Sequence, residues 1–202
     1  VLACLVVGIG AYLIGKGSGD DAGAASQEGE TAGKQAGAID GATGVELWRS
    51  DGTEAGTRRV KDIQSGSFAF SPKNLTNVGG TVYFSAGDIT SGVELWKSDG
   101  TAAGTVRVKD IRSGSLSSGP RFLTNVGGTL YFRANDGTGA ERWRSDGTED
   151  GTRRLKSIQS SSSSSDPNFL TNVGGVLYFR ANAGPTGVQR WTTAGTAAGP
   201  RR

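Results

Sequence analysis

Short runs of β-branched and aromatic residues alternate with clusters of glycine, serine, aspartate and threonine throughout the chain after residue 45. One stretch of this kind contains four such runs, at Arg121–Val126, Thr129–Ala134, Ala140–Ser145 and Thr152–Ile158. Runs of this length are typical of β-strands, and Gly127-Gly128 between the first two is typical of a two-residue hairpin turn. No amphipathic helical period longer than two turns follows residue 45. The pattern predicts an all-β fold of four-stranded antiparallel meanders.

This four-strand pattern repeats along the chain. The repeat is marked by a tryptophan every 48, 47 and 48 residues, at Trp48, Trp96, Trp143 and Trp191. A second landmark, Leu-Thr-Asn-Val-Gly-Gly, begins 27 residues after each of the first three tryptophans, and a Tyr-Phe pair follows it. Only the loop after the Tyr-Phe pair changes in length. Residues 45–202 are therefore predicted to form repeat units that start near residues 45, 93 and 140, with a partial unit from 188, each resembling a β-propeller blade.

The repeat region is short for a closed propeller. It provides the last two strands of one blade, two complete blades and the first three strands of another, because Pro200 disfavours a final strand. Propellers usually close with 4–8 blades. We therefore expect a partial propeller that is completed by other copies of the chain, as a homo-oligomer or polymer, or that is part of a longer propeller. An open array of units is the further arrangement that the sequence permits.

The repeated core Glu-Leu-Trp-x-x-Asp-Gly-Thr, followed by Val-Lys-Asp-Ile and by Leu-Thr-x-Val-Gly-Gly-Thr-Leu-Tyr-Phe, resembles the ELWxxDGT repeat family over residues 38–199. The resemblance implies a secreted or surface protein of a bacterium, with propeller-like blades and no enzymatic activity. Four positions of the core depart from the pattern. Arg142 and Arg190 replace the leucine, Gln189 replaces the glutamate, and Ala194 replaces the aspartate.

The first 44 residues differ in composition from the repeats. Residues 1–15 are uncharged and apolar, within the roughly 7–15 residues of a signal-peptide core and below the roughly 20 of a membrane span. We expect an apolar helix that acts as a secretion signal or membrane anchor, with Cys4 as a candidate for lipidation and a short buried helix as the alternative. Residues 16–44, rich in glycine and alanine, predict a flexible spacer. An extracellular or cell-surface location follows.

The composition excludes several kinds of chemistry. The chain has no histidine and one cysteine, so it has no Ser-His-Asp triad, no histidine general base and no zinc site built from thiolates or imidazoles. No cofactor and no metal ion are expected. The sequence also contains no non-repeated group of acids and bases that would indicate a catalytic centre. We therefore expect a protein that is not an enzyme.

The repeated acidic residues have two interpretations. Asp51, Asp99 and Asp146 recur once in each unit, as a structural turn residue or as a ligand for calcium. Calcium loops place several oxygen ligands in one loop, whereas each of these loops repeats a single carboxylate, so the turn is favoured. The repeated glutamates, a residue or two before each tryptophan, are interpreted as hydrogen-bonding groups of the scaffold rather than as acids. They are Glu46, Glu94 and Glu141.

Aromatic and basic residues supply the candidate interaction surfaces. Each repeated tryptophan (Trp48, Trp96, Trp143 and Trp191) is interpreted as packing between blades, with a ligand platform as the alternative. Phe68 and Phe70 occur in one unit only, in a connection between blades, and are candidates for an assembly or ligand contact. The last strand of each unit is basic, which favours a solvated edge and no specific nucleic acid. Two functions remain: a structural or adhesive surface module that self-associates, and a lectin-like propeller that binds a polysaccharide between blades.

Overall fold

The computed structural model describes residues 3–7, 10–16, 45–64, 71–155, 158 and 164–193, and for the first two ranges it describes the backbone alone. The described residues form fifteen strands and one short 3₁₀ helix. In chain order these are β1 (Ala3–Val7), β2 (Gly10–Lys16), β3 (Val45–Ser50), β4 (Arg58–Lys61), β5 (Lys73–Val78), β6 (Thr81–Asp88), β7 (Gly92–Ser98), β8 (Val106–Lys109), β9 (Arg121–Val126), β10 (Thr129–Asn135), β11 (Ala140–Ser145), β12 (Arg153–Arg154), β13 (Asn168–Val173), β14 (Val176–Asn182), η1 (Gly184–Thr186) and β15 (Val188–Thr193). The predicted all-β class is confirmed.

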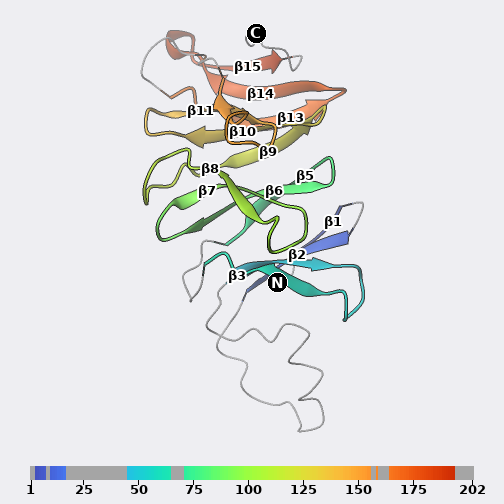
Figure 1. Ribbon diagram of the computed structural model, residues 1–202. Helices are drawn as coiled ribbons and strands as arrows, with labels where there is room; N and C mark the ends of the chain where they lie inside the picture. Colours follow the sequence, from blue (N-terminus) through green and yellow to red (C-terminus); the bar gives the residue numbers. More distant parts are fainter. Residues whose placement is uncertain are drawn as a thin grey trace.

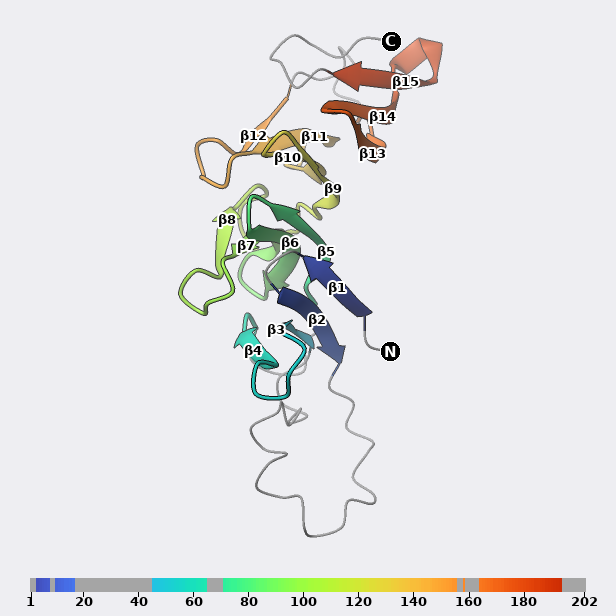
Figure 2. The same cartoon turned by 90° about the vertical axis from the view of Figure 1, so that its right-hand side faces the viewer.

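The strands form four antiparallel sheets that follow the chain order. Sheet 1 is β1–β4, sheet 2 is β5–β8, sheet 3 is β9–β12 and sheet 4 is β13–β15. The sheets are arranged in an open row from the N-terminal to the C-terminal end (Figure 1), with β4, β8 and β12 along one side (Figure 2). Among the described residues the row does not close into a barrel or a propeller. The closed-monomer arrangement, which the sequence disfavoured, is therefore not observed.

Local sequence explains the strand order within each sheet. Gly127 and Gly128 have φ angles of 57° and 81°, as a type I′ hairpin turn between β9 and β10 requires. In the next hairpin, Phe132 pairs directly with Trp143, and the two rings stack with centroids 6.4 Å apart. Sheets 2 and 4 repeat this pair, as Phe84 with Trp96 and Phe179 with Trp191. Of the expected last strand, Thr152–Ile158, the described residues form only the short β12.

The N-terminal helix that the sequence predicted is not seen. Residues 3–7 and 10–16 are instead the strands β1 and β2, and β2 pairs with β3 so that Leu13 lies opposite Trp48. They provide the first two strands of sheet 1, whereas the repeat pattern predicted only its last two. Val7, Gly8 and Tyr12 have the spacing of Val78, Gly79 and Tyr83 in sheet 2, which explains why an apolar run forms a hairpin here. No helix among the described residues has the length and apolar character needed to span a membrane.

The hydrophobic core is divided into layers between successive sheets. The layer between sheets 2 and 3 contains Val78, Tyr83 and Leu95 from one sheet and Leu130 and Phe132 from the next. Equivalent residues form the layer between sheets 1 and 2, around Leu47 and Phe84, and the layer between sheets 3 and 4, around Tyr131 and Phe179. Each sheet therefore offers one face to the preceding sheet and a different face to the following one. The two ends of the row therefore expose two different kinds of sheet face.

Candidate interaction surfaces at the ends of the row

The repeated aspartates form structural turns after the tryptophan strands. The Asp99 carboxylate accepts hydrogen bonds from the backbone N–H (2.8 Å) and the hydroxyl (2.7 Å) of Thr101. These bonds, the hydroxyl bond foremost, hold the pKa of Asp99 below its usual value. Asp51 and Asp146 make the same two bonds, with Thr53 and Thr148. Within the described residues no three potential ligands gather into a metal-binding group.

The other polar residues of the same turn also form hydrogen bonds within it. The hydroxyl of Ser98 contacts that of Thr105 at 2.7 Å inside the protein, and it also accepts a bond from the Gly100 N–H. The Thr105 hydroxyl in turn donates to the carbonyl of Thr101 at 2.6 Å. A Cβ added to Gly104 would overlap the Asp99 carboxylate, which explains the glycine at this position. The Ser-Asp-Gly-Thr motif is therefore explained by turn geometry.

The buried glutamates fasten each sheet to the connection that leads to the next one. Glu94, whose side chain is fully buried, accepts bonds from the N–H groups of Ile111 (3.0 Å) and Ser118 (3.0 Å) and from the Ser118 hydroxyl (2.6 Å). Burial raises the pKa of Glu94, and the Ser118 hydroxyl opposes that rise. Glu141 makes the corresponding contacts with the N–H and the hydroxyl of Ser165. These carboxylates are thus scaffold groups that connect neighbouring sheets.

The first glutamate differs in its surroundings. Glu46 is buried and accepts a bond from the Ile63 N–H at 3.1 Å. Burial raises the pKa of Glu46 to about 7. The residue 24 positions later, which is Ser118 or Ser165 in the other units, is Phe70 in this one. Phenylalanine has no hydroxyl to donate, so the residue at this repeat position cannot supply the hydroxyl bond that Glu94 and Glu141 receive.

Polar side chains also cross between the sheets along both edges of the row. On the inner edge, Asn125 donates to the carbonyl of Asn77 at 3.0 Å, and Asn172 donates to the carbonyl of Asn125 at 2.8 Å. On the other edge, Lys61 donates to the carbonyl of Thr105 at 2.8 Å. The same side chain at the equivalent position of the next unit, Lys109, donates to the carbonyl of Glu149 at 3.3 Å. These repeated bridges fix the register of one sheet against the next.

The tryptophans occupy two environments. Trp96, Trp143 and Trp191 are buried in the layers between sheets. Trp48, in sheet 1, is only partly buried, and its sheet is the first in the row. Phe68 and Phe70, the other candidates from the sequence, lie outside the described residues. Among the candidate residues that the structure describes, Trp48 is therefore the best placed for contact with another molecule.

The far end of the row exposes apolar side chains whose counterparts in sheets 2 and 3 are buried. Val173 and Tyr178 of sheet 4 are 58% and 45% exposed, whereas their counterparts in sheet 3, Val126 and Tyr131, are 5% and 4% exposed. Arg190, at the position of the fully buried Leu95, is also exposed. Val173, Tyr178 and Arg190 are named here the open face of sheet 4. Repeat position alone could have revealed this face, because each member has a buried residue as its counterpart one unit earlier.

Arg142 is a charged residue in the apolar layer between sheets 3 and 4. It occupies the position of Leu47 and Leu95, is 5% exposed, and lies over the ring of Phe179 at 4.7 Å from the centroid. Its Nε and Nη1 have no hydrogen-bond partner among the described residues. Burial lowers the pKa of Arg142 to about 10. The layer between sheets 3 and 4 thus contains a buried cation that its counterparts lack.

Comparisons of this chain with protein-family models, with curated proteins and with solved structures found no match.

Proposed function

We propose that this protein is a structural module of the cell surface or extracellular space that assembles head to tail through the ends of its row of propeller-type sheets. The main support is the exposure of Val173 and Tyr178, at 58% and 45%, in a position where two earlier sheets of the same chain bury their counterparts. An apolar surface of this kind is stabilised when another sheet covers it. The resemblance to the ELWxxDGT repeat family supports the same location and the same non-enzymatic role.

The two end faces are different and complementary in kind. Sheet 4 offers the valine and tyrosine that normally cover a following sheet. Sheet 1 offers Trp48, whose counterparts Trp96, Trp143 and Trp191 fit beneath a preceding sheet. Contact between two different faces is heterologous, and it forms a ring where the rotation closes and a filament where it does not. Such an assembly would complete a propeller or extend the row.

The assembly proposal is tested by the mass of the full chain in solution. Sedimentation velocity of the wild type over a range of concentrations should show species larger than one chain. Tyr178→Asp places a charge on the open face of sheet 4 and should shift the population to monomer. Ile89→Asp is the matched control, because Ile89 is 62% exposed in a loop of sheet 2 and away from either end. A wild type that is monomeric at every concentration would overturn the proposal.

A second candidate function, binding of carbohydrate, is favoured by one exposed aromatic pair. Phe122 and Phe169 lie on adjacent strands with ring centroids 6.2 Å apart and are 37% and 65% exposed. Both have left-handed backbone angles, φ 56° and 54°, at a bulge where sheet 2 has Asn74 at φ 59°. Asparagine adopts this conformation more readily than phenylalanine. The bulge explains the backbone angle, and contact of the two exposed rings with a ligand would explain why aromatic residues occupy these positions.

This candidate is tested by replacing the pair with the residue of sheet 2. The double variant Phe122→Asn/Phe169→Asn should lose binding to neutral oligosaccharides on a glycan array while its melting temperature stays the same or rises. Wild-type protein that binds no glycan would exclude this function.

A further inference from the structure

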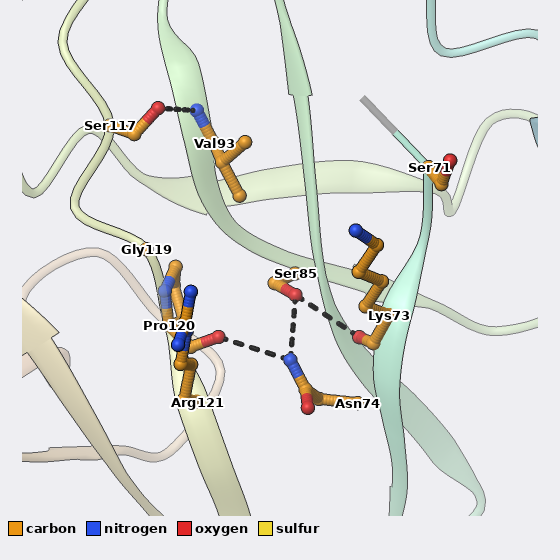
Figure 3. Close-up of a pocket in the computed structure, with 9 residues that line it drawn as sticks. All are labelled: Ser71, Lys73, Asn74, Ser85, Val93, Ser117, Gly119, Pro120 and Arg121. Carbon is orange, nitrogen blue, oxygen red and sulfur yellow. Dashed lines mark hydrogen bonds between the residues drawn. The ribbon is translucent and has the colours of Figure 1, made fainter. Parts of the chain in front are cut away.

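A cleft between sheets 2 and 3 has a volume of about 300 Å³. It is bounded by β5 and β6 on one side and by residues 117–121, which lead into β9, on the other (Figure 3). We propose that this cleft binds the carboxylate of an acidic sugar unit. The inference deepens the carbohydrate-binding candidate above, and it is independent of head-to-tail assembly.

Two small residues create the cleft. The equivalent place between sheets 3 and 4 is crossed by an ion pair, in which Arg133 and Asp166 approach to 2.6 Å. The counterpart of Arg133 in sheet 2 is Ser85, and the counterpart of Asp166 is Gly119. A Cβ on Gly119 would meet no atom within 4 Å. The cleft therefore occupies the space that a side-chain ion pair crosses in the next interface.

The walls of the cleft are held in place by hydrogen bonds between the two sheets. Asn74 donates to the Pro120 carbonyl at 3.2 Å and to the Ser85 hydroxyl at 3.0 Å. The Gly119 N–H donates to the carbonyl of Val93 at 3.1 Å. Figure 3 shows the Asn74 amide bridging between the two walls. A site with fixed walls loses little conformational entropy when a ligand enters, which favours binding.

The charge of the cleft selects the kind of ligand. Lys73 of β5 and Arg121 of β9 line it from opposite walls (Figure 3), and none of the described lining residues is acidic. Neither cation forms a salt bridge within the described part of the chain. An arginine guanidinium binds a carboxylate through two parallel hydrogen bonds, and a lysine adds a point charge. A ligand with one carboxylate is the chemistry that these two residues recognise.

The remaining lining groups indicate a hydroxylated ring rather than a bare anion. The lining includes the side chains of Ser71 and Asn74 and the backbone near Gly119. Hydroxyl and amide groups of this kind exchange hydrogen bonds with sugar hydroxyls. The volume of about 300 Å³ lies at the lower end of the roughly 300–1,000 Å³ range of ligand sites, which fits a single sugar unit. A uronic acid combines both chemical requirements.

The test compares three probes on the full chain by isothermal titration calorimetry. Glucuronate should bind at least about tenfold more tightly than either glucose or acetate, since charge-assisted bonds contribute about 1.5–3 kcal/mol each. Lys73→Gln and Arg121→Gln should each weaken glucuronate binding by about tenfold. Arg107→Gln, which removes a cation from β8 outside the cleft, is the matched control and should leave binding unchanged.

A second variant closes the cleft with the ion pair that occurs between sheets 3 and 4. Ser85→Arg/Gly119→Asp copies the Arg133–Asp166 pair into the cleft and should abolish glucuronate binding with the strand content by circular dichroism preserved. Gly119 has φ 57°, and Asp166 adopts φ 43° at the equivalent place, so the aspartate is compatible with the backbone. Wild-type protein that does not bind glucuronate, equal binding of acetate, or full binding by the double variant would each overturn the proposal. Binding of glucuronate is separate from the test with Phe122→Asn/Phe169→Asn, because a loss of neutral-glycan binding in that variant would not change it.

Discussion

The carboxylate of Glu94 and the hydroxyl of Ser118 share a hydrogen bond of 2.6 Å in a fully buried site, where sheet 2 meets the connection to sheet 3. The pair explains why a charged residue lies inside this fold. A glutamate in the middle of a strand fixes the path of a connection that would otherwise contribute few apolar contacts. The bond therefore positions the whole of the following sheet.

We expect the substitution Ser118→Ala to destabilise the protein by about 1–3 kcal/mol, because it leaves the buried Glu94 carboxylate without one of its donors. The free energy of unfolding in urea measures the effect. Ser115→Ala is the control, since Ser115 is exposed in the same connection. Equal stability of the two variants would show that the Glu94–Ser118 bond does not hold the connection.

A pH dependence is expected from Glu46. Its pKa is about 7 in the folded protein because of burial, against an ordinary value of 4.5. A carboxyl with a raised folded pKa favours folding below its unfolded pKa, and this contribution is lost as the pH rises from about 4.5 to 7. The shift in pKa corresponds to about 3 kcal/mol. Glu46→Gln, which copies Gln189 of the last unit, should remove this part of the pH dependence of unfolding.

The control for Glu46 is the same change at Glu149, which is exposed. Glu149→Gln should leave the fall in stability between pH 4.5 and 7 in place. A Glu46→Gln profile that coincides with that of the wild type would contradict the raised pKa.

Replacing Arg142 with leucine should stabilise the protein by about 1 kcal/mol or more. Leu47 and Leu95 show that leucine fits this position, and replacing a buried charge with an apolar residue is often stabilising. Thermal unfolding followed by circular dichroism measures the change. A lower melting temperature for Arg142→Leu would mean that the contact with Phe179 outweighs the burial of the guanidinium.

The turn after β7 gives a prediction about the glycines of the repeat. Gly104→Ala should destabilise the protein because the new Cβ would displace the Asp99 carboxylate from Thr101. Gly114→Ala is an informative comparison, since Gly114 has a positive φ of 83° and an open surrounding. Its cost should come from backbone strain alone. A double-mutant cycle with Asp99→Ala identifies the cause. If Gly104→Ala costs less stability in the Asp99→Ala background than in the wild type, the overlap between the new Cβ and the Asp99 carboxylate is responsible.

The sequence predicted the regular units well because their strands are bounded by local signals. Arg121–Val126 and Ala140–Ser145 were predicted with the bounds that the structure shows, since a Gly-Gly hairpin and an Asp-Gly turn limit them. The strands β1 and β2 were missed. Their apolar residues resemble a signal or anchor, and residues 17–44, between β2 and β3, disrupt the regular spacing. That connection is the same one whose length varies in the other units, and this was the signal that could have revealed them.

The candidate sites were harder to predict because they depend on differences between units. Tyr178 is exposed because no described sheet packs on the far face of sheet 4. The cleft forms because Ser85 and Gly119, on opposite sides of one interface, are both small. Neither residue type indicates a ligand by itself. Lys73 and Arg121 are 48 residues apart, and only the stacking of β5 against β9 brings them to one cleft.

The open row also has a mechanical consequence. Each sheet contacts its neighbours in the row, so a force applied to the two ends passes through every interface in series. We expect the first rupture between sheets 3 and 4, because this interface buries the Arg142 guanidinium with two nitrogens that lack hydrogen-bond partners among the described residues. In a pulling experiment on single molecules we expect sheet 4 to detach first, and Arg142→Leu to raise the force required. Chains joined through the proposed head-to-tail contact would then extend in steps, with sheet 4 of each chain separating first.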